Sequence, residues 1–486
     1  MQFTDGWWTW ESMARIRDVL REATVSRYPG ESLAIGVVLR NRPQHVGALL
    51  SVLGDNHCVV TLSAFQPDAM LGSDLTEMRL PVVMADESDW NRPGMRDAAA
   101  AAGSVAIALR GDRAEPARLL APGGTAPARD YRRAVPGVAV EMLTSGTTGR
   151  PKRVHLRAHS LELGILSDAA KGTKPTRSTA ATPAVSILWN PLVHIAGTWG
   201  TISTVVFGMR LSLLERFDIP TLLARIREHR PAVISLVPSA MRMLLDANVD
   251  PHELSSVAFV RSGTARVAPE LIDEFEARFG KPVIVTYGAT EFAGAVTTWT
   301  QDEWRVHKHA KRGSSGRVNA GFEIRIVDPD TFAVLPPDAE GLLEVRAEQV
   351  LGPEWIRTTD LARIDGDGFL YVTGRADRAI NRGGFKVLPD VVVDALERHP
   401  AVREACVVAM PDARLGAVPV AAVEVDARAP GPVPTPEDLE AFVRRILLPY
   451  QVPVRIRVVE SLPRTPSMKA SQPDVLRLFQ DGGAER

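Results

Sequence analysis

One short segment of the chain has residue types that suit phosphate binding. The ten residues Leu143–Lys152 read Leu-Thr-Ser-Gly-Thr-Thr-Gly-Arg-Pro-Lys and follow the apolar run Val138–Leu143. Hydroxyl residues interleaved with glycines give a loop whose backbone N–H groups and hydroxyls can converge on phosphate oxygens. A Walker A loop has four residues between its glycines, and here there are two, so the segment is a different kind of loop. A polar turn between two strands is the ordinary alternative, but the whole combination favours a nucleotide site.

A second segment could hold a metal ion beside that nucleotide. Tyr287–Glu291 follows the predicted strand Val283–Thr286. Open α/β sheets bind ligands at the carboxyl ends of their parallel strands. Glu291 offers a hard oxygen ligand for Mg²⁺, and Thr290 offers a hydroxyl that can face phosphate. Taken alone, the segment is also typical of the start of a solvated helix.

An acid and an arginine farther along the chain could bind a sugar. Asp360 closes the segment Ile356–Asp360, and Arg375 lies in Gly374–Arg378. A carboxylate can accept hydrogen bonds from two hydroxyls, as a ribose requires, and a guanidinium can donate to the same sugar or to phosphate. The alternative is a surface ion pair.

Lysine is scarce in this chain, because 8 of its 57 basic residues are lysine and the others are arginine. Lys469 ends the polar segment Leu462–Lys469 near the C-terminus. A lysine in such a loop could bring a mobile point charge to developing phosphoryl and carboxylate charge. A solvated tail lysine is the alternative.

The elements that would position these residues follow an α/β pattern. Apolar runs separated by amphipathic segments predict parallel strands joined by helices, in a doubly wound arrangement. The predicted strands are Ser32–Leu39, His57–Leu62, Pro81–Ala85, Ser104–Leu109, Ala232–Val237, Val257–Val260 and Val283–Thr286. The predicted helices are Gln44–Leu53, which Pro43 opens and Gly54 closes, and Pro269–Phe279, which Gly280 stops.

The pattern changes after about residue 310. Glu323–Val327 and Leu342–Arg346 alternate like antiparallel strands, which predicts a β-rich subdomain. We predict a boundary near Asp377 and a small α+β domain after it. Its elements are helix Asp390–Arg398, strands Glu404–Val408 and Val420–Val425, and helix Pro436–Leu447. The Ala/Pro/Gly-rich segments Ala114–Ala128 and Ala427–Pro436 are predicted to be exposed linkers.

Composition excludes some classes of function. The formal net charge of −1 lacks the basic footprint of a nucleic-acid-binding protein. Cys58 and Cys406 lie far apart, without the spacing of metal ligands, which indicates a reducing compartment. No apolar run approaches the roughly 20 residues that span a bilayer, and the first residues lack the features of a signal peptide. These observations predict a cytoplasmic protein that does not enter the membrane.

Together, and in this order, the motifs resemble those of the adenylate-forming superfamily. Its members are the acyl- and aryl-CoA synthetases, the adenylation domains of nonribosomal peptide synthesis and beetle luciferase, and this chain is most like an acyl-CoA synthetase. The resemblance implies a large N-terminal domain, residues 1–376, that binds ATP and the acyl group. It also implies a small mobile C-terminal domain, residues 377–486. Mg²⁺ and ATP would activate a small carboxylic acid as acyl-AMP, and coenzyme A would then accept the acyl group.

The resemblance also implies a role for each matching residue. The ATP phosphates would be bound by Thr144, Ser145, Gly146, Thr147, Thr148, Gly149 and Lys152, and adenine and the α-phosphate by Gly263, Thr264, Ala265, Tyr287, Gly288, Ala289 and Thr290. Glu291 would bind the metal, Asp360 and Arg375 the ribose, and Asp377 would be the hinge. Lys469 would bridge the acyl carboxylate and the α-phosphate, with Thr148, Thr290 and Glu291 as its catalytic partners. Trp189, Asn190, His194, Trp199, Ser262 and Gly263 would shape the acyl pocket, and Gly383, Gly384 and Lys386 the tunnel for the thiol.

Several points stay open at the level of sequence. Thr359 and Met468 replace glycines that the family usually has, which restricts the backbone near catalytic groups. The acceptor is either free CoA or the phosphopantetheine of a carrier protein. A luciferase-like monooxygenase and a nucleotide-binding regulatory protein without turnover are further alternatives, and the presence of both Glu291 and Lys469 disfavours the latter. Trp189 and Trp199 suit a core as well as a pocket, and we expect at least one to be a core residue. The identity of the acid and the oligomeric state, with a homodimer among the options, are not readable.

Overall fold

A seven-stranded sheet organises the first third of the chain. The computed structural model describes residues 1–4, 6–120, 130–143, 153–170, 183–426, 429 and 431–480. The strand order is β7-β6-β5-β3-β4-β8-β9, in which β3, β4, β5, β6 and β8 are parallel and the outer β7 and β9 are antiparallel. The bounds are β3 Ala34–Leu39, β4 Cys58–Ser63, β5 Val82–Asp86, β6 Val105–Leu109, β7 Ala117–Leu119, β8 Val138–Leu143 and β9 Arg153–Arg157.

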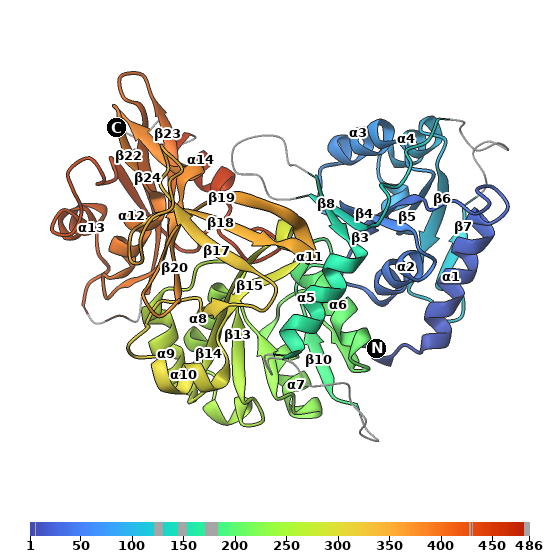
Figure 1. Cartoon of the computed structure of the whole chain (residues 1–486), viewed down its shortest axis with the longest axis horizontal. Coiled ribbons are helices and arrows are strands. Elements are labelled where there is room, and N and C mark those ends of the chain that lie inside the picture. The colour runs from blue at the N-terminus through green and yellow to red at the C-terminus, as the bar shows by residue number, and fades with distance from the viewer. Residues whose placement is uncertain are drawn as a thin grey trace.

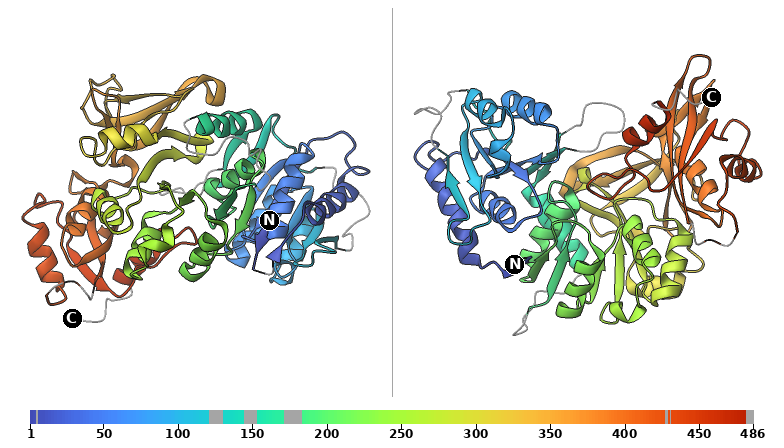
Figure 2. Two further views of the ribbon diagram at one scale, coloured as in Figure 1. Left: turned by 90° about the horizontal axis from the view of Figure 1, so that it is seen from below. Right: turned by 180° about the vertical axis from the view of Figure 1, so that it is seen from behind.

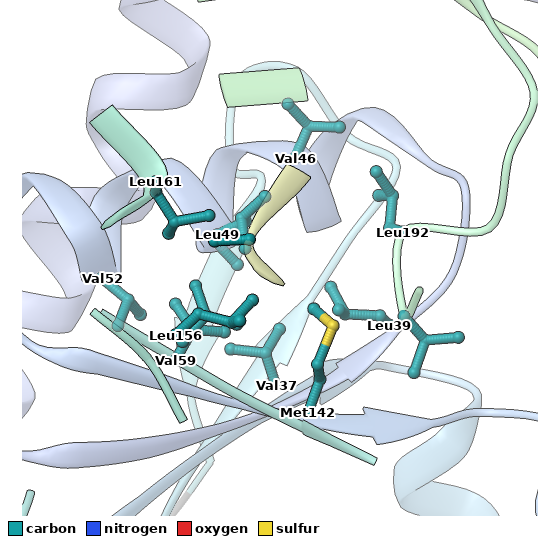
Figure 3. Packing of buried hydrophobic residues seen from close by; sticks show 14 of the residues in the cluster. Val37, Leu39, Val46, Leu49, Val52, Val59, Met142, Leu156, Leu161 and Leu192 are labelled. Carbon is teal, nitrogen blue, oxygen red and sulfur yellow. The ribbon is translucent and has the colours of Figure 1, made fainter. Parts of the chain in front are cut away.

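Helices cover both faces of this sheet, which makes its inner strands apolar throughout. On one face Val37, Leu39 and Val59 pack under α1 (Trp10–Thr24) and α2 (Pro43–Gly54), as Figure 3 shows for α2 with Val46, Leu49 and Val52. On the other face Val38, Val60 and Leu62 pack against α3 (Asp68–Met78) and α4 (Met95–Ala101). The prediction of a doubly wound α/β arrangement is confirmed.

Two more sheets form the middle of the molecule. In β12-β13-β14-β15-β16 the first three strands are parallel and the last two are antiparallel. Next to it lies β10-β11-β1-β2, which brings residues of the N-terminus against β11. The bounds are β1 Gln2–Phe3, β2 Gly6–Trp7, β10 Val185–Leu188, β11 Arg210–Leu213, β12 Val233–Ser235, β13 Phe259–Ser262, β14 Val283–Ala289, β15 Gly294–Thr298 and β16 Arg317–Val318. The helices of this region are α5 Ala158–Ala170, α6 Ile195–Val206, α7 Ile219–His229, α8 Pro238–Asp246, α9 Pro269–Phe279 and α10 Gln301–His307.

An antiparallel sheet and a smaller α+β unit complete the chain. The first has the order β17-β18-β19-β20, with β17 Glu323–Val327, β18 Gly341–Ala347, β19 Gly352–Ile364 and β20 Leu370–Arg375, and the short helix α11 (Glu348–Leu351) precedes β19. Residues 377–480, here called the C-terminal unit, contain the sheet β22-β21-β24-β23 with β25 beside β24. Their bounds are β21 Ile380–Arg382, β22 Phe385–Val387, α12 Pro389–Glu397, β23 Val402–Asp412, β24 Gly416–Val425, α13 Pro436–Val443, β25 Arg455–Val459 and α14 Gln472–Gln480.

The seven-stranded sheet and most of the C-terminal unit lie at opposite ends of the long axis, with the middle sheets between them (Figures 1 and 2). The part preceding residue 377 is here called the N-terminal body. The C-terminal unit has cores of its own, which α12 and α13 form on one face of its sheet and α14 on the other. Within the described ranges, no helix is both long and apolar enough to cross a bilayer.

Several predicted elements need correction. Strand β12 ends at Ser235, two residues before the predicted end. Strand β23 extends to Asp412 and strand β24 begins at Gly416, each four residues beyond the prediction, because the two strands pair along their lengths. The segment Ala114–Ala128 is not wholly a linker, because Ala117–Leu119 pairs with β6 as β7. Strand β13 runs to Ser262, two residues beyond the prediction. Strand β14 runs to Ala289, since antiparallel pairing with β15 extends it past Thr286. Helix α13 ends at Val443, four residues before the predicted end, and Leu447 is buried in the turn that follows.

Candidate active site

The carboxyl ends of β13 and β14 bring two of the predicted binding segments together. The strands run parallel, with Ser262 paired to Val285. A side chain at Gly263 would place its Cβ 2.7 Å from the Thr286 hydroxyl oxygen, so only glycine lets this loop lie against β14. Thr286 donates a hydrogen bond to the Ser262 carbonyl at 3.3 Å. Gly263–Ala265 and Tyr287–Thr290 therefore lie side by side at the carboxyl ends of parallel strands, which is where the sequence predicts an α/β ligand site.

Tyr287 links this strand end to the antiparallel sheet. Its phenol donates a hydrogen bond to the Asp360 carboxylate at 2.6 Å. Burial, followed by the charge of Asp360, raises the pKa of Tyr287 well above its ordinary value, so the phenol stays protonated. The amide N–H of Asp360 is bound by the Thr358 hydroxyl at 3.0 Å. The Asp360 carboxylate is thus held in place, and its Oδ2 accepts the hydrogen bond from Tyr287.

Arg375 faces Asp360 across the β19–β20 ladder and is held by several acceptors. Its guanidinium forms a bidentate pair with Asp377 at 2.9 and 2.8 Å and lies 3.9 Å from Asp360. It also donates to the Thr359 hydroxyl at 2.6 Å. The threonine that replaces a family glycine therefore orients this arginine.

Thr290 and Glu291 lie on the 3₁₀ turn Thr290–Phe292 directly after β14. Glu291 is exposed, and it lies close enough to Tyr287 for its charge to add to the effects of burial and Asp360 on the tyrosine pKa. Among the residues described, no three His, Cys, Asp or Glu side chains surround a common metal-sized space. Glu291 fits Mg²⁺ as a single carboxylate ligand, with phosphate oxygens and water supplying the rest, which is the usual way a nucleotide-bound Mg²⁺ is held.

The loop Thr144–Lys152 lies outside the described residues, but both strands beside it are placed. Leu143 at the end of β8 pairs with Arg153 at the start of β9. Strand β9 in turn packs against the turn Thr290–Phe292. Strand β9, which follows the segment predicted to bind phosphate, therefore lies beside the turn that carries Glu291.

Lys469 reaches the same site from the C-terminal unit. Its side chain is exposed, but many protein atoms lie around it. The resulting loss of hydration lowers its pKa to about 8, and the positive charges of Arg378 and Arg375 add to this effect. His194 is half-buried at the start of α6, and its burial together with the charge of Lys469 lowers its pKa to about 4. The imidazole is therefore neutral at pH 7. The lysine from one end of the chain and the histidine from its middle therefore lie within electrostatic range of each other.

The loop before Lys469 fits closely against the N-terminal body. Ser239 donates a hydrogen bond to the Met468 carbonyl at 2.9 Å. Met468 has a φ of 65°, the left-handed region in which glycine is favoured, so this position requires the backbone of the glycine that it replaces. A cavity of about 310 Å³ lies beside the loop. Residues of the N-terminal body and of the C-terminal unit line this cavity, among them Arg40, Trp189, Pro191, Arg216, Arg464 and Thr465.

The residues predicted for the acyl pocket separate into two groups. Trp189 is a core residue, because its ring packs edge-on against Phe217 and its indole N–H donates to the Ser235 carbonyl at 2.9 Å. The carbonyl of the neighbouring Asn190 accepts from Asn41. Trp199 instead lies beside β13, with the Arg261 guanidinium 5.6 Å from its ring centre. Ser262 is buried next to that arginine, and its hydroxyl has no hydrogen-bond partner among the described residues.

The predicted thiol-tunnel residues lie elsewhere in this conformation. Gly383 and Gly384 form the turn of the β21–β22 hairpin with φ values of 58° and 93°. Gly383 donates its N–H to the Leu415 carbonyl, and Lys386 is exposed. The neighbouring Phe385 stacks on Tyr450 at 4.8 Å. These contacts are all within the C-terminal unit, while Lys469 occupies the site.

The pKa of Lys469 gives a testable pH dependence. If its ammonium takes part in catalysis, kcat/KM for pyrophosphate release from ATP and acid should fall about 10-fold per pH unit above about 8, since this parameter reports the free enzyme. The Lys469→Arg variant, measured from pH 7 to 9.5, should lose this fall, because a guanidinium stays charged. A fall that persists in Lys469→Arg would assign the titration to another group.

Comparison with known proteins identifies the family. Residues 9–352 match the AMP-binding enzyme family, and residues 394–469 match the AMP-binding enzyme C-terminal domain. The chain belongs to the AMP-binding enzyme family. The predicted resemblance to the adenylate-forming superfamily is therefore confirmed.

Several curated proteins are similar to this AMP-binding enzyme. The 4-coumarate–CoA ligase-like 5 of Oryza sativa subsp. japonica is 29% identical over 75% of this chain and 68% of its own. The 4-coumarate–CoA ligase 1 of Petroselinum crispum is 31% identical over 70% of this chain and 64% of its own. The chain thus spans about two thirds of the length of these relatives.

Solved structures share the fold of this AMP-binding enzyme over nearly its whole length. ATP-bound MatB from Rhodopseudomonas palustris has a TM-score of 0.80 at 23% identity and covers 98% of this chain and 93% of its own. The o-succinylbenzoate CoA synthetase of Bacillus subtilis with its acyl-adenylate intermediate has a TM-score of 0.73 at 23% identity, covering 96% and 92%. A mutant of the amide bond synthetase Mcba from Marinactinospora thermotolerans has a TM-score of 0.75 at 25% identity, covering 96% and 93%.

The structure of this AMP-binding enzyme adds residues that sequence reasoning missed. Arg378, one residue after the predicted hinge, acts on the pKa of Lys469, and its buried Nε has no hydrogen-bond partner among the described residues. Ser239 holds the Met468 carbonyl. Arg378 lies inside a motif that the sequence does show. Nothing in the sequence connects Ser239 to a residue more than two hundred positions away.

Proposed function

We propose that this AMP-binding enzyme is an acid–thiol ligase that converts a carboxylic acid to acyl-AMP with Mg²⁺ and ATP and then transfers the acyl group to coenzyme A. The observation that carries the proposal is that Lys469 lies within electrostatic range of both His194 and Arg375, so that its charge lowers the pKa of the histidine. The named activities of the CoA ligase relatives support the second step. Solved relatives bound to ATP, to ATP and a magnesium ion, or to an acyl-adenylate intermediate support the first step.

In the first half-reaction, a carboxylate oxygen attacks the α-phosphorus of ATP and pyrophosphate leaves. The Lys469 ammonium offsets the repulsion between the carboxylate and the phosphate, and Arg375 with Asp360 holds the ribose. Thr148 and Thr290 position the phosphates by their hydroxyls. Bound Mg²⁺ would neutralise phosphate charge, with Glu291 as its protein ligand. His194, neutral at pH 7, bounds the acyl pocket with Trp199, Ser262 and Gly263.

In the second half-reaction, a thiol attacks the carbonyl carbon of the mixed anhydride and AMP leaves. The contacts given for the Gly383–Lys386 hairpin lie within the C-terminal unit here, so we propose that this unit turns about Asp377 between the steps. We propose that the two domains that turn relative to each other are residues 1–376 and residues 377–486. The turn would exchange Lys469 for the hairpin and line a tunnel for the thiol.

A panel assay tests this function. The protein is incubated with Mg·ATP and single acids, including 4-coumarate, o-succinylbenzoate and short aliphatic acids, with and without CoA. Acid-dependent pyrophosphate release and a CoA thioester detected by mass spectrometry are the expected result. A thioester that forms only on a phosphopantetheine carrier protein would identify the other acceptor. A lack of acid-dependent pyrophosphate release across the panel, with ATP still bound, would favour a regulatory nucleotide-binding protein.

The metal assignment of Glu291 gives a further prediction. We expect Glu291→Gln to raise the Mg²⁺ concentration needed for half-maximal pyrophosphate release by at least about 10-fold, the order of loss seen when metal sites are disturbed. The exposed side chain is not part of the core, so thermal stability should be unchanged. Glu270→Gln, on the exposed surface of α9, is the matched control. An unaltered Mg²⁺ titration in Glu291→Gln would remove Glu291 as a ligand.

A further inference from the structure

Both ends of helix α8 contact the C-terminal unit. Ser239, the second residue of this nine-residue helix, donates its hydroxyl hydrogen to the Met468 carbonyl at 2.9 Å. At the other end, Asp246 forms an ion pair with Arg403 of β23. Nine helical residues span about 13 Å, so the two contacts are well separated points of attachment.

These two contacts are joined to one another inside the C-terminal unit. Arg403 also pairs with Glu424 of β24 at 3.1 Å. Glu424 accepts the backbone N–H of Leu462 at 3.0 Å and lies 3.5 Å from the Arg464 guanidinium. Arg464 then donates to the Met468 carbonyl at 3.3 Å, the same oxygen that Ser239 holds. The contacts therefore form a closed ring that starts and ends on α8, here called the α8 ring.

The α8 ring is well shielded from solvent. The side chains of Asp246, Glu424 and Arg464 are 13%, 5% and 21% exposed. Fully exposed ion pairs contribute little to stability, whereas removing one partner of a shielded pair leaves a charge without compensation. The ring fixes the loop 462–469 on both of its flanks, directly before the lysine that enters the site.

We propose that the α8 ring positions Lys469 for carboxylate activation, and that Asp246 is the residue by which the N-terminal body holds the loop through Arg403. The inference rests on the proposed function, in which Lys469 serves only the first half-reaction. Turning of the C-terminal unit breaks the contacts at Ser239 and Asp246 while those among Arg403, Glu424 and Arg464 move together. A second pair between the two parts, Arg266 with Asp394 of α12, breaks in the same movement.

The test uses Asp246→Asn, which removes one charge at constant size and leaves the contacts within the C-terminal unit intact. The rate of pyrophosphate release from ATP and acid should fall about 10-fold. A fall of this size is typical when a contact that favours one of two conformations is lost. Thioester formation from supplied acyl-AMP and CoA should be unchanged or faster. Glu274→Gln is the matched control, because it breaks the 2.7 Å pair between Glu274 of α9 and Arg242 of the same helix α8, inside the N-terminal body. This control should leave both half-reactions within about twofold.

A second measurement needs no turnover. Amide hydrogen exchange of residues 462–471, followed by mass spectrometry, should become faster in Asp246→Asn and not in Glu274→Gln. The double variant Asp246→Asn/Arg403→Ala should lose no more adenylation than Arg403→Ala alone, since both changes break one link. Unchanged exchange, or equal loss of both half-reactions with reduced thermal stability, would overturn the proposal. If the parent protein releases no pyrophosphate while the exchange responds as expected, the proposed function fails, and only the holding of the loop 462–469 by Asp246 stands.

Discussion

We expect Lys469→Ala to lose almost all carboxylate activation and to keep thioester formation from acyl-AMP. The ammonium lies within electrostatic range of His194 and Arg375, and alanine removes the charge that we propose offsets repulsion between carboxylate and phosphate. Loss of one preorganised electrostatic group commonly costs about 10²–10³-fold in rate, or roughly 3–4 kcal/mol. Pyrophosphate release from ATP and acid should fall by that factor. With chemically made acyl-AMP and CoA, the rate should stay near that of the parent protein.

The control for this variant is another lysine of the same chain. Lys281 donates to the Ser255 carbonyl at the amino end of β14, away from Glu291. Lys281→Ala should therefore leave both half-reactions unchanged. Full activity of Lys469→Ala from ATP would show that Lys469 is a solvated loop residue, and the proposed mechanism would lose its main cation. Loss of both half-reactions with normal folding would show that Lys469 also acts in thiol transfer.

The sheets of the N-terminal body could be predicted because their strands are apolar for a simple physical reason. Val37 and Val38 face opposite sides of the first sheet, and both are fully buried. A strand covered on both faces must be apolar throughout, and Pro43 and Gly54 mark the helix between two such strands. The site residues after β13 and β14 could be predicted for the related reason that parallel strands end at one edge.

Contacts between residues that are distant in the sequence could not be predicted. Tyr287–Ala289 reads as a loop after a strand, yet it belongs to β14 because β15 returns beside it. Trp189 and Trp199 lie ten residues apart in one apolar segment, and only tertiary packing makes the first a core residue and puts the second beside Arg261 of β13. The hydroxyl of Thr359 suggests no partner from its neighbours in sequence, but in the fold it binds Arg375.

Met468 shows how a departure from a family pattern can preserve geometry. The sequence predicts restricted backbone freedom where methionine replaces glycine, and the residue adopts the left-handed conformation regardless. Such a conformation costs of order 1–3 kcal/mol and persists only where the surroundings fix it. The hydrogen bond from Ser239 and the packing of the Met468 side chain against the core of the middle sheets supply that fixation. Position 468 therefore keeps the backbone that Lys469 needs, at a cost that glycine would not have.

The largest effect on the second half-reaction should come from Asp377→Pro. Asp377 is the middle residue of the 3₁₀ turn Ala376–Arg378 that connects the two parts of the chain. A 3₁₀ turn has φ values near −50° to −70°, which proline adopts, so the variant is compatible with the conformation that holds Lys469 in the site. Because proline fixes φ, the turn that would bring the Gly383–Lys386 hairpin to the acyl-AMP should be blocked. We expect pyrophosphate release within about 10-fold of the parent protein and thioester formation reduced by at least about 100-fold.

A second substitution distinguishes the two effects of Asp377→Pro, which fixes the backbone angle φ and also removes a carboxylate. Asp377 also holds Arg375 by a bidentate pair, and Asp377→Ala removes that pair while leaving φ free. Asp377→Ala should therefore weaken ATP use, seen as a raised KM for ATP, with no selective loss of thioester formation from supplied acyl-AMP. The ratio of the two half-reaction rates is the decisive quantity, because it cancels differences in folded protein. Equal ratios for Asp377→Pro and Asp377→Ala would show that the chain does not turn at this residue, and the pivot would then lie elsewhere between β20 and β21.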